Sequence, residues 1–314
     1  MSFPARRLLW AGWLCLVGAI AACGDGGGPS DATGSAGHFS ITVRFIDSTP
    51  PTASLQSAFA HATTRWQSVI ADSVSSIPIT LAAGSCDSVQ PAIKERVKDL
   101  LVLVHIRKIA DTVPGQAILG ESGPCLVRNP GNIPILGIMS LNSSTLASID
   151  SSGLLDDVIV HEMGHLLGFG TVWDLDGLVH DTTTDDPWFS GASAQAAFHR
   201  ALPVYSDKIV PVEAGGGEGT TFSHWRESVM DNELMTGFLN QGANPLSAVT
   251  VESMADLGYT VNESAADPWP STSSSALVAA RSARTPTAPR VETKVTPPRF
   301  WVSGSGQVSR IPAR

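Results

Sequence analysis

The chain has 314 residues, of which 43% are hydrophobic, and a formal net charge of -9 at pH 7. This length and apolar content are enough to bury a sizeable core, so the composition describes a globular protein of one large domain or two lobes. The acidic balance argues against nucleic acid as a partner, because nucleic-acid-binding domains carry basic surfaces.

Residues 1–22 have the order of a secretory signal peptide. Two arginines precede an apolar run over residues 8–20, and a run of about 13 residues is too short to span a bilayer as a helix. The segment Ile-Ala-Ala-Cys that ends at Cys23 resembles a bacterial lipobox. This implies a lipid on Cys23, a membrane anchor and a place in the bacterial cell envelope, facing the periplasm or the cell surface. Ordinary cleavage that leaves Cys23 free is the alternative, and residues 23–38 are expected to form a flexible tether.

After the tether, apolar periodicity predicts one long helix and several strands. The helix covers residues 55–72 and carries apolar residues at helical spacing. A last helix is expected to open at Pro245 and to end before Gly258. Strands are predicted for residues 41–47, 78–83, 100–109 and 135–141.

A further helix is predicted around His161–His165, the most informative segment of the chain. Histidines four residues apart lie on one helical face, about 40° apart around its axis, so both imidazoles can bind one zinc ion. Glu162 stands beside them, where its carboxylate can take a proton from a metal-activated water. A chance occurrence of this spacing is the alternative reading.

The ends of this helix are also indicated by the sequence. Ser151 or Ser152 is expected to cap its start, followed by two aspartates that suit the positive end of the helix dipole. Gly168, three residues after the second histidine, suits the turn with which the helix ends. A glycine at this spacing belongs to the metzincin signature, but Thr171 stands where the third histidine of that signature usually lies.

A catalytic zinc ion needs a third protein ligand, and three histidines follow the helix: His180, His199 and His224. His180 falls in a loop, and His199 falls in an expected helix where an ordinary half-buried histidine is the simpler reading. His224 is followed directly by Trp225 and, 11 residues after it, by Met235 in a Leu-Met-Thr-Gly segment.

Four segments together resemble the leishmanolysin-type metallopeptidases, a metzincin branch with a long insertion between the second and third histidines. They are the His-Trp pair, Glu-Leu-Met over residues 233–235, Gly-Glu-Ser-Gly-Pro-Cys over residues 120–125, and Asp-Leu-Gly-Tyr over residues 256–259. The resemblance covers roughly residues 39–268. It implies that the zinc ligands are His161, His165 and His224, with Glu162 as catalytic base and Met235 as the Met-turn beneath the metal.

The same resemblance implies an α+β, metzincin-like two-lobed catalytic domain. Residues 39–170 would form an N-terminal lobe with a mixed sheet and two long helices, and residues 171–270 a mostly irregular C-terminal lobe. The strand over residues 135–141 would lie near the upper rim of the cleft, where an extended peptide can pair with a sheet edge. Such a domain is a zinc-dependent endopeptidase that hydrolyses peptide bonds of proteins or peptides. Neither Tyr205 nor Tyr259 follows the Met-turn, where some metzincins have a tyrosine that assists at the metal.

Two alternatives, and one possible additional ion, remain open at this point. A carboxylate could supply the third ligand in another class of zinc peptidase, from Glu213, Glu218 or Glu233. An inactive envelope lipoprotein could keep the same fold as a binding module, although an intact Glu162 disfavours this. Calcium is a weaker possibility, because an acidic loop carries clustered carboxylates: Asp174, Asp176, Asp181, Asp185 and Asp186.

The cysteines and the C-terminal residues complete the prediction. Cys15 would leave with the signal peptide and Cys23 would take the lipid, so Cys86 and Cys125 remain as a disulfide pair in an oxidising envelope. Residues 271–314 carry seven arginines or lysines against a single glutamate and open on a serine-rich run. They are therefore expected to be a disordered basic tail. The protein is expected to be a monomer.

Overall fold

The computed structural model describes five ranges of the chain: residues 37–110, 118–217, 219–240, 242–270 and 292–312. They belong to one compact unit over residues 36–314. The predicted signal peptide and Cys23 lie outside the described residues. Within the described ranges, none of the helices combines the length and the apolar character that crossing a bilayer requires.

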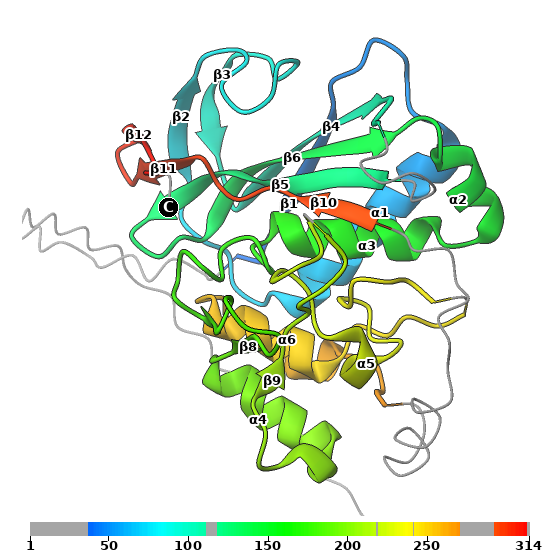
Figure 1. The fold of residues 1–314 in the computed structure, drawn as a ribbon. Helices are drawn as coiled ribbons and strands as arrows, with labels where there is room; N and C mark the ends of the chain where they lie inside the picture. Colours follow the sequence, from blue (N-terminus) through cyan, green and yellow to red (C-terminus); the bar gives the residue numbers. More distant parts are fainter. Residues whose placement is uncertain (1–36, 111–117, 218, 241, 271–291, 313–314) are drawn as a thin grey trace, which may run out of the picture. The chain divides into compact units, whose positions relative to one another are not determined.

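A seven-stranded mixed sheet forms the upper layer in the view of Figure 1. Its strand order is β1-β4-β6-β5-β11-β12, and β10 also pairs with β5. β1, β4 and β6 run parallel, β5 runs antiparallel to β6, and β10 and β11 run parallel to β5. The strands are β1 (Ile41–Phe45), β4 (Leu100–Arg107), β5 (Ile118–Asn129), β6 (Pro134–Asn142), β10 (Glu292–Val295), β11 (Phe300–Ser303) and β12 (Val308–Arg310).

The sheet is covered on both faces, which explains the unbroken apolar run of β4. Every residue from Leu100 to Val104 is buried, and successive side chains join two different cores. One core lies on the face that the two long helices described below cover. The other is closed by a hairpin of β2 (Ile77–Leu81) and β3 (Ile93–Val97).

A disulfide joins this hairpin to the sheet. Cys86 lies in the loop between β2 and β3, and Cys125 lies in β5. Their Cα atoms are 5.6 Å apart, which is an ordinary separation for a disulfide. The predicted pairing of these two cysteines is confirmed.

Two long helices, α1 (Ala53–Val69) and α3 (Leu155–Leu166), pack against the lower face of the sheet (Figure 1). The indole Nε1–H of Trp66 in α1 donates to the Val160 carbonyl oxygen of α3 at 2.8 Å. Trp66 is fully buried, so this bond satisfies its one polar atom and fixes the two helices against each other. The predicted mixed sheet with two long helices is confirmed.

The start of α3 differs from the prediction. Ser151 and Ser152 are the last residues of a separate helix, α2 (Leu146–Ser152), and Gly153 turns the chain with a φ of 76° before α3 begins. The expectation that one of these serines caps α3 is therefore wrong. Their hydroxyls donate instead to carbonyl oxygens three residues earlier, within α2.

Residues 171–270 consist mostly of loops joined by short elements, as expected for the second half of the domain. The last helix begins at Ala248 and is capped by the Ser247 hydroxyl, so the predicted start at Pro245 is wrong by a few residues. The elements are α4 (Ala192–Ala201), α5 (Glu227–Met230), α6 (Ala248–Asp256), the 3-10 helices η1 (Pro203–Tyr205) and η2 (Glu263–Ala265), β7 (Val179–His180), β8 (Trp188–Phe189) and β9 (Val210–Pro211).

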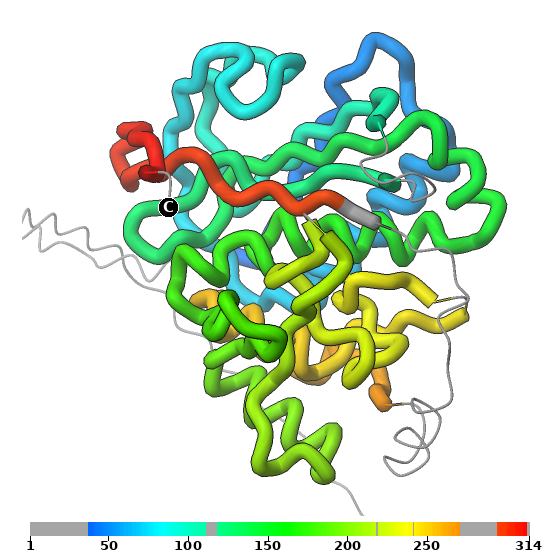
Figure 2. The backbone as a smooth tube through the Cα atoms, viewed as in Figure 1, coloured from blue at the N-terminus to red at the C-terminus, as the bar shows by residue number. Residues whose placement is uncertain are grey.

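The prediction of a disordered tail is wrong for residues 292–312. They add β10, β11 and β12 to the sheet, and Figure 2 shows this segment running along the sheet in front of α3. Val302 is fully buried, and the Trp301 indole donates to Asn132 Oδ1 at 3.0 Å. The prediction of disorder rested on the average composition of residues 271–314, which is basic and rich in serine, and this average does not reveal the few apolar residues of the last strands. Residues 271–291 lie outside the described residues.

Strand β5 was not predicted, although it borders the functional site. It contains Gly120, Gly123 and Pro124, residue types that are uncommon in strands. Its pairing with β6 shifts register between Pro124 and Leu126, so the strand is irregular where the proline cannot donate to the ladder. Long-range pairing on both of its edges overrides the weak local preference.

Candidate metal centre

Three histidine side chains converge on one point beneath β5. The Nε2 atoms of His161 and His165 are 3.0 Å apart, and they lie 3.1 Å and 3.0 Å from the Nε2 atom of His224. His161 and His165 lie one turn apart on α3, and His224 comes from the loop before α5. All three are buried, and they make up the one group of three or more potential metal ligands among the described residues.

Backbone carbonyls set the protonation of all three rings. The Nδ1 atom of His161 lies 2.7 Å from the Leu234 oxygen, and that of His165 lies 2.9 Å from the Phe169 oxygen. The Nδ1 atom of His224 lies 3.1 Å from the Thr220 oxygen. A carbonyl only accepts, so each Nδ1 carries the proton and each Nε2 presents a lone pair.

Three lone pairs that face one another at 3.0–3.1 Å repel unless a cation lies among them. A tetrahedral zinc ion with Zn–N bonds of about 2.0–2.1 Å holds its nitrogen ligands about 3.3 Å apart, close to the spacing found here. The donor set, its geometry and the carbonyl support of each ring all fit a zinc site. These residues are therefore suited to hold the metal.

Burial keeps the three rings neutral at physiological pH. It lowers the pKa of His161 to about 4 and the pKa of His224 to about 3, because a charged imidazolium loses its hydration. It also lowers the pKa of His165 well below the usual value, and the neighbouring histidines add to the effect. Neutral imidazole is the form that binds metals.

Glu162 lies directly beside this cluster and is completely buried. The hydroxyl of Ser122, on β5, donates to Oε2 of Glu162 at 2.5 Å. A buried carboxylate that is held by a neutral hydroxyl keeps a defined orientation and stays available to accept a proton. The sequence alone did not single out Ser122, although it lies within the Gly-Glu-Ser-Gly-Pro-Cys segment.

Met235 lies against the zinc helix from below. A Cβ atom added at Gly164, between the two histidines of α3, would come within 2.9 Å of the Met235 methyl carbon and 3.1 Å of its sulfur. The absence of a side chain at Gly164 thus lets the methionine approach the helix backbone. Met235 is fully buried.

Glu233 holds the turn that carries Met235. Its Oε2 accepts from the Met235 backbone N–H at 2.6 Å, and its Oε1 accepts from the backbone and hydroxyl of Ser247 and from the Thr250 hydroxyl. These bonds account for both oxygens and link the turn to the start of α6. Glu233 is therefore a structural residue here and is not one of the converging ligands.

Glu213 also has a structural position in the described chain. Its two carboxylate oxygens accept from the backbone N–H groups of Gly215 and Glu227, at 3.0 Å and 3.1 Å. Glu218, the remaining carboxylate candidate for the third ligand, lies outside the described residues.

The other two histidine candidates lie elsewhere. The ring of His180 stacks on Trp188 with a centroid distance of 4.4 Å. The Nε2 of His199 donates to the Lys208 carbonyl at 2.6 Å, on the surface of α4. Neither joins the metal-binding group among the described residues.

Trp225 anchors the loop that carries His224. Its indole packs against Phe169, Trp173 and Phe189, with centroid distances of 5.0, 4.9 and 5.4 Å. Its Nε1–H donates to the Thr250 hydroxyl at 2.8 Å. The aromatic cluster thus fixes the backbone next to the third histidine.

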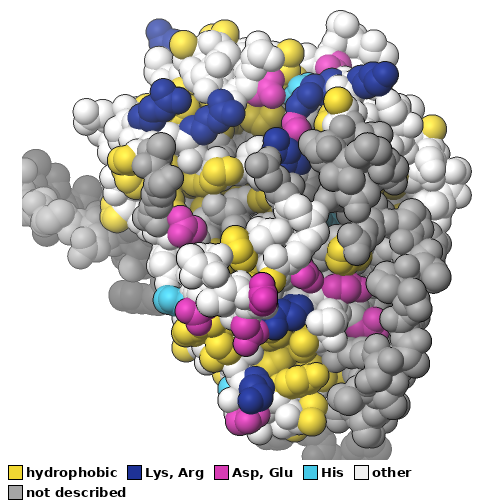
Figure 3. Space-filling view, viewed as in Figure 1, with side chains coloured by type: hydrophobic (Ala, Val, Ile, Leu, Met, Phe, Trp, Pro, Cys, Tyr) yellow, Lys and Arg dark blue, Asp and Glu magenta, His cyan; other side chains and the backbone are white. Residues whose placement is uncertain are grey.

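The acidic loop residues do not gather into a second metal site within the described chain. Asp176 accepts from Asn132, Asp181 accepts from the Trp188 indole, and Asp186 pairs with Arg226. Figure 3 shows several acidic side chains on the lower half of the viewed face, among basic and hydrophobic ones. The weaker expectation of bound calcium receives no support from this arrangement.

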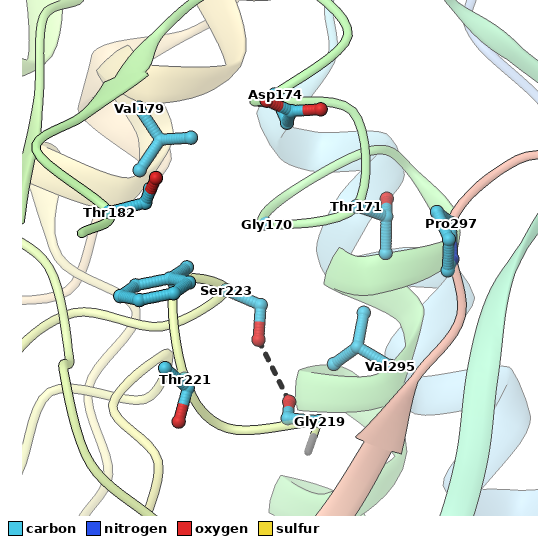
Figure 4. A pocket seen from close by; sticks show the side chains of 11 residues that line it. Gly170, Thr171, Asp174, Val179, Thr182, Gly219, Thr221, Ser223, Val295 and Pro297 are labelled. Atoms are coloured by element: carbon cyan, nitrogen blue, oxygen red, sulfur yellow. Dashed lines mark hydrogen bonds between the residues drawn. The ribbon is translucent and has the colours of Figure 1, made fainter. Parts of the chain in front are cut away.

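A cavity of about 300 Å³ is lined in part by Ser223, the residue before His224 (Figure 4). Gly170 and Thr171, directly after the zinc helix, form one wall, and the segment that ends at Ser223, next to His224, forms another. Val295 and Pro297 of the C-terminal segment close a third side.

Comparison with known sequences places the chain in a family. A family model described as leishmanolysin, Peptidase_M8, matches residues 97–285, which is more than half of the chain. The chain therefore belongs to the leishmanolysin peptidase family.

Individual relatives are distant and longer. The chain is 26% identical to leishmanolysin of Leishmania donovani over 156 residues, which cover 47% of this chain and 26% of that protein. It is 25% identical over 158 residues to leishmanolysin of Leishmania chagasi, covering 48% and 26%. A leishmanolysin homolog of Crithidia fasciculata is 24% identical over 155 residues, covering 47% and 23%. The matched region thus spans about a quarter of the length of these relatives.

Proposed function

We propose that this chain is a zinc-dependent endopeptidase, with His161, His165 and His224 as the metal ligands. The observation that carries the proposal is the convergence of three Nε2 lone pairs within 3.1 Å of one another, beside the buried carboxylate of Glu162. A cluster of lone pairs without a proton among them is a poor arrangement for stability alone. Membership of the leishmanolysin family supports the same assignment.

The chain's own residues have separable roles in this reaction. A bound zinc ion would polarise the peptide carbonyl and make water a stronger nucleophile at neutral pH. Glu162 takes the proton that the attacking water loses and returns it to the amine that leaves. Ser122 donates to Oε2 of Glu162 and so restricts the orientation of this carboxylate.

Met235 and Trp225 support the centre without contacting substrate. Met235 packs against Gly164 under the zinc helix, and Trp225 holds the His224 loop within the aromatic cluster. Both residues therefore act through the positions of the histidines.

The location of the protein belongs to the same proposal. A lipid on Cys23 would tether the catalytic domain to a membrane of the bacterial cell envelope through residues 24–38. The lipobox-like segment and the apolar run before it support this anchor.

Cleavage of an unfolded protein such as reduced casein tests the proposed activity. We expect cleavage that stops when a chelator removes the metal and returns when one equivalent of zinc is added. Binding of casein without cleavage, at full zinc content, would instead identify the chain as an inactive binding module with the same fold.

A further inference from the structure

The outer edge of β5 is filled by the C-terminal part of the same chain. We call residues 292–297 the C-terminal strap. β10 pairs in parallel with the first half of β5, and Figure 1 shows it lying in front of α3. The partners in register are Glu292 with Ile118, Thr293 with Gly120, Lys294 with Glu121, and Val295 with Ser122.

The strap continues its contact beyond the strand. The Thr296 N–H donates to the Ser122 carbonyl oxygen at 2.9 Å, and the Thr296 hydroxyl donates to the same oxygen at 3.3 Å. A Cβ atom added at Gly123 would come within 2.0 Å of the Thr296 carbonyl oxygen. Only glycine at this position therefore permits so close an approach of the two backbones.

Ser122 connects the strap to the proposed catalytic residue. Its carbonyl oxygen accepts from Thr296, while its hydroxyl donates to Glu162 at 2.5 Å. Val295 and Pro297 also line the cavity that Gly170 and Ser223 line (Figure 4). The strap thus contacts Ser122, which bonds Glu162, and lines a cavity that reaches the residue before His224.

The residues after the strap anchor it firmly. β11 and β12 form a hairpin, and β11 pairs in parallel with the second half of β5, from Leu126 to Asn129. Val302 of β11 is fully buried in the core on the hairpin side of the sheet. The strap is therefore tethered beside its own binding edge, at the high effective concentration that a short tether provides.

From these contacts we propose that the C-terminal strap is an autoinhibitory segment that competes with extended peptide substrates for the edge of β5. A sheet edge presents one row of backbone donors and acceptors, so it can pair with one strand at a time. A long substrate that pairs with this edge must first displace the strap. The inference rests on the proposed peptidase function, and it concerns residues beyond the 97–285 region that the family model matches.

The strap then controls apparent affinity through its opening equilibrium. The apparent dissociation constant for a long substrate equals the intrinsic constant divided by the fraction of molecules with an open strap. Removing one backbone hydrogen bond from the strap should raise the open fraction, and hence kcat/KM, about 3- to 10-fold.

A graded series at Thr296 tests this directly. Thr296→Pro removes the N–H that bonds Ser122 and keeps an extended backbone, whereas Thr296→Ser keeps both donors and Thr296→Val keeps only the N–H. We expect kcat/KM for unfolded casein to rise about 3- to 10-fold for the proline variant, less for valine, and not at all for serine. Millimolar peptide of residues 292–298 should inhibit the proline variant, and a scrambled peptide should not.

Hydrogen exchange on the zinc-free proteins provides a readout that does not depend on activity. We expect the amides of Lys294 and Val295 to exchange faster in Thr296→Pro, with the hairpin and the melting temperature unchanged. If the proline variant does not fold, Val295→Asp replaces it in the test. This variant adds a second carboxylate to the cavity that Asp174 also lines, and repulsion between the two charges should weaken the contact of the strap.

The outcomes separate the two proposals. No cleavage by any variant, with faster exchange in the strap, refutes the peptidase function but leaves the release of the strap supported. Active variants with faster exchange and unchanged kcat/KM overturn the inference. Exchange as slow as in the original chain also overturns it, because the strap would then be a permanent strand of the sheet.

Discussion

Ser122 on β5 donates its hydroxyl hydrogen to Oε2 of Glu162 on α3, with an oxygen–oxygen distance of 2.5 Å. The bond joins the sheet edge, which the C-terminal strap occupies, to the carboxylate beside the histidine cluster. Because Glu162 is fully buried, its orientation depends on such partners. We expect this contact to affect turnover more than zinc binding.

Ser122→Ala should lower kcat about 10-fold, because a hydrogen bond to a charged group is lost and the carboxylate is held less well. KM and zinc content should stay close to those of the unaltered protein. Ser122→Thr, which keeps the hydroxyl, should restore most of kcat. A parallel loss of zinc, or a loss that threonine does not repair, would mean that Ser122 matters only for folding.

Glu162→Gln should keep the zinc and lose about two to four orders of magnitude in kcat, the usual range for a missing general base. Zinc content measured by mass spectrometry and turnover measured on the same sample give the two values. Glu162 is not one of the three grouped ligands, so its replacement should not release the metal. If zinc is lost together with activity, the role of general base assigned here to Glu162 is wrong.

His224→Ala should abolish stoichiometric zinc binding, because two histidines without a third ligand hold the ion weakly. His180→Ala and His199→Ala are matched controls that should keep one zinc per chain. His180 stacks on Trp188, and His199 bonds the Lys208 carbonyl, and neither belongs to the group of potential metal ligands among the described residues. Full zinc content in His224→Ala would overturn the ligand assignment.

Glu227 should make the protein less stable as the pH rises. Burial raises the pKa of Glu227 to about 7 from its ordinary value of 4.5, so between these pH values the folded state holds a proton that the unfolded state has released. The free energy of unfolding should therefore fall between pH 4.5 and 7 and then level off. Glu227→Gln should remove about 1–3 kcal/mol of this fall. Urea unfolding at pH 5 and pH 8 measures it, and an equal pH dependence in both proteins would contradict the assignment.

Cys23→Ser should release the protein from membranes if Cys23 carries the lipid. Labelled fatty acid should enter the original chain and not the serine variant. Stable anchoring needs more than one acyl chain, as on bacterial lipoproteins. A serine variant that stays in the membrane fraction would place the anchor elsewhere in the chain.

Several features of this protein could be read from the sequence because they depend on neighbours along the chain. The four-residue spacing of His161 and His165 puts both on one helical face, whatever the rest of the fold does. Apolar runs predicted β1, β2, β4 and β6 for the same reason. The Cys86–Cys125 pair was predicted for a different reason. The other two cysteines of the chain were assigned to the signal peptide and to the lipid, so only these two were left to pair.

The sequence was less informative where pairing is distant. His224 lies 59 residues beyond His165, and only its resemblance to a known pattern distinguished it from the two other histidines before the fold brought it 3.0 Å from His165. Helix boundaries near Ser152 and Pro245 were also misplaced, because competing local hydrogen bonds decide which residue caps a helix.

Only the tertiary structure decided the role of β5 and of the residues that line it. Its glycines and Pro124 argue against a strand locally, but pairing with β6 on one edge and with β10 and β11 on the other supplies the missing stability. The strap and Ser122 become visible only through these pairings. Backbone hydrogen bonds between segments more than 170 residues apart leave no periodic trace in either segment, so no local pattern could have predicted them.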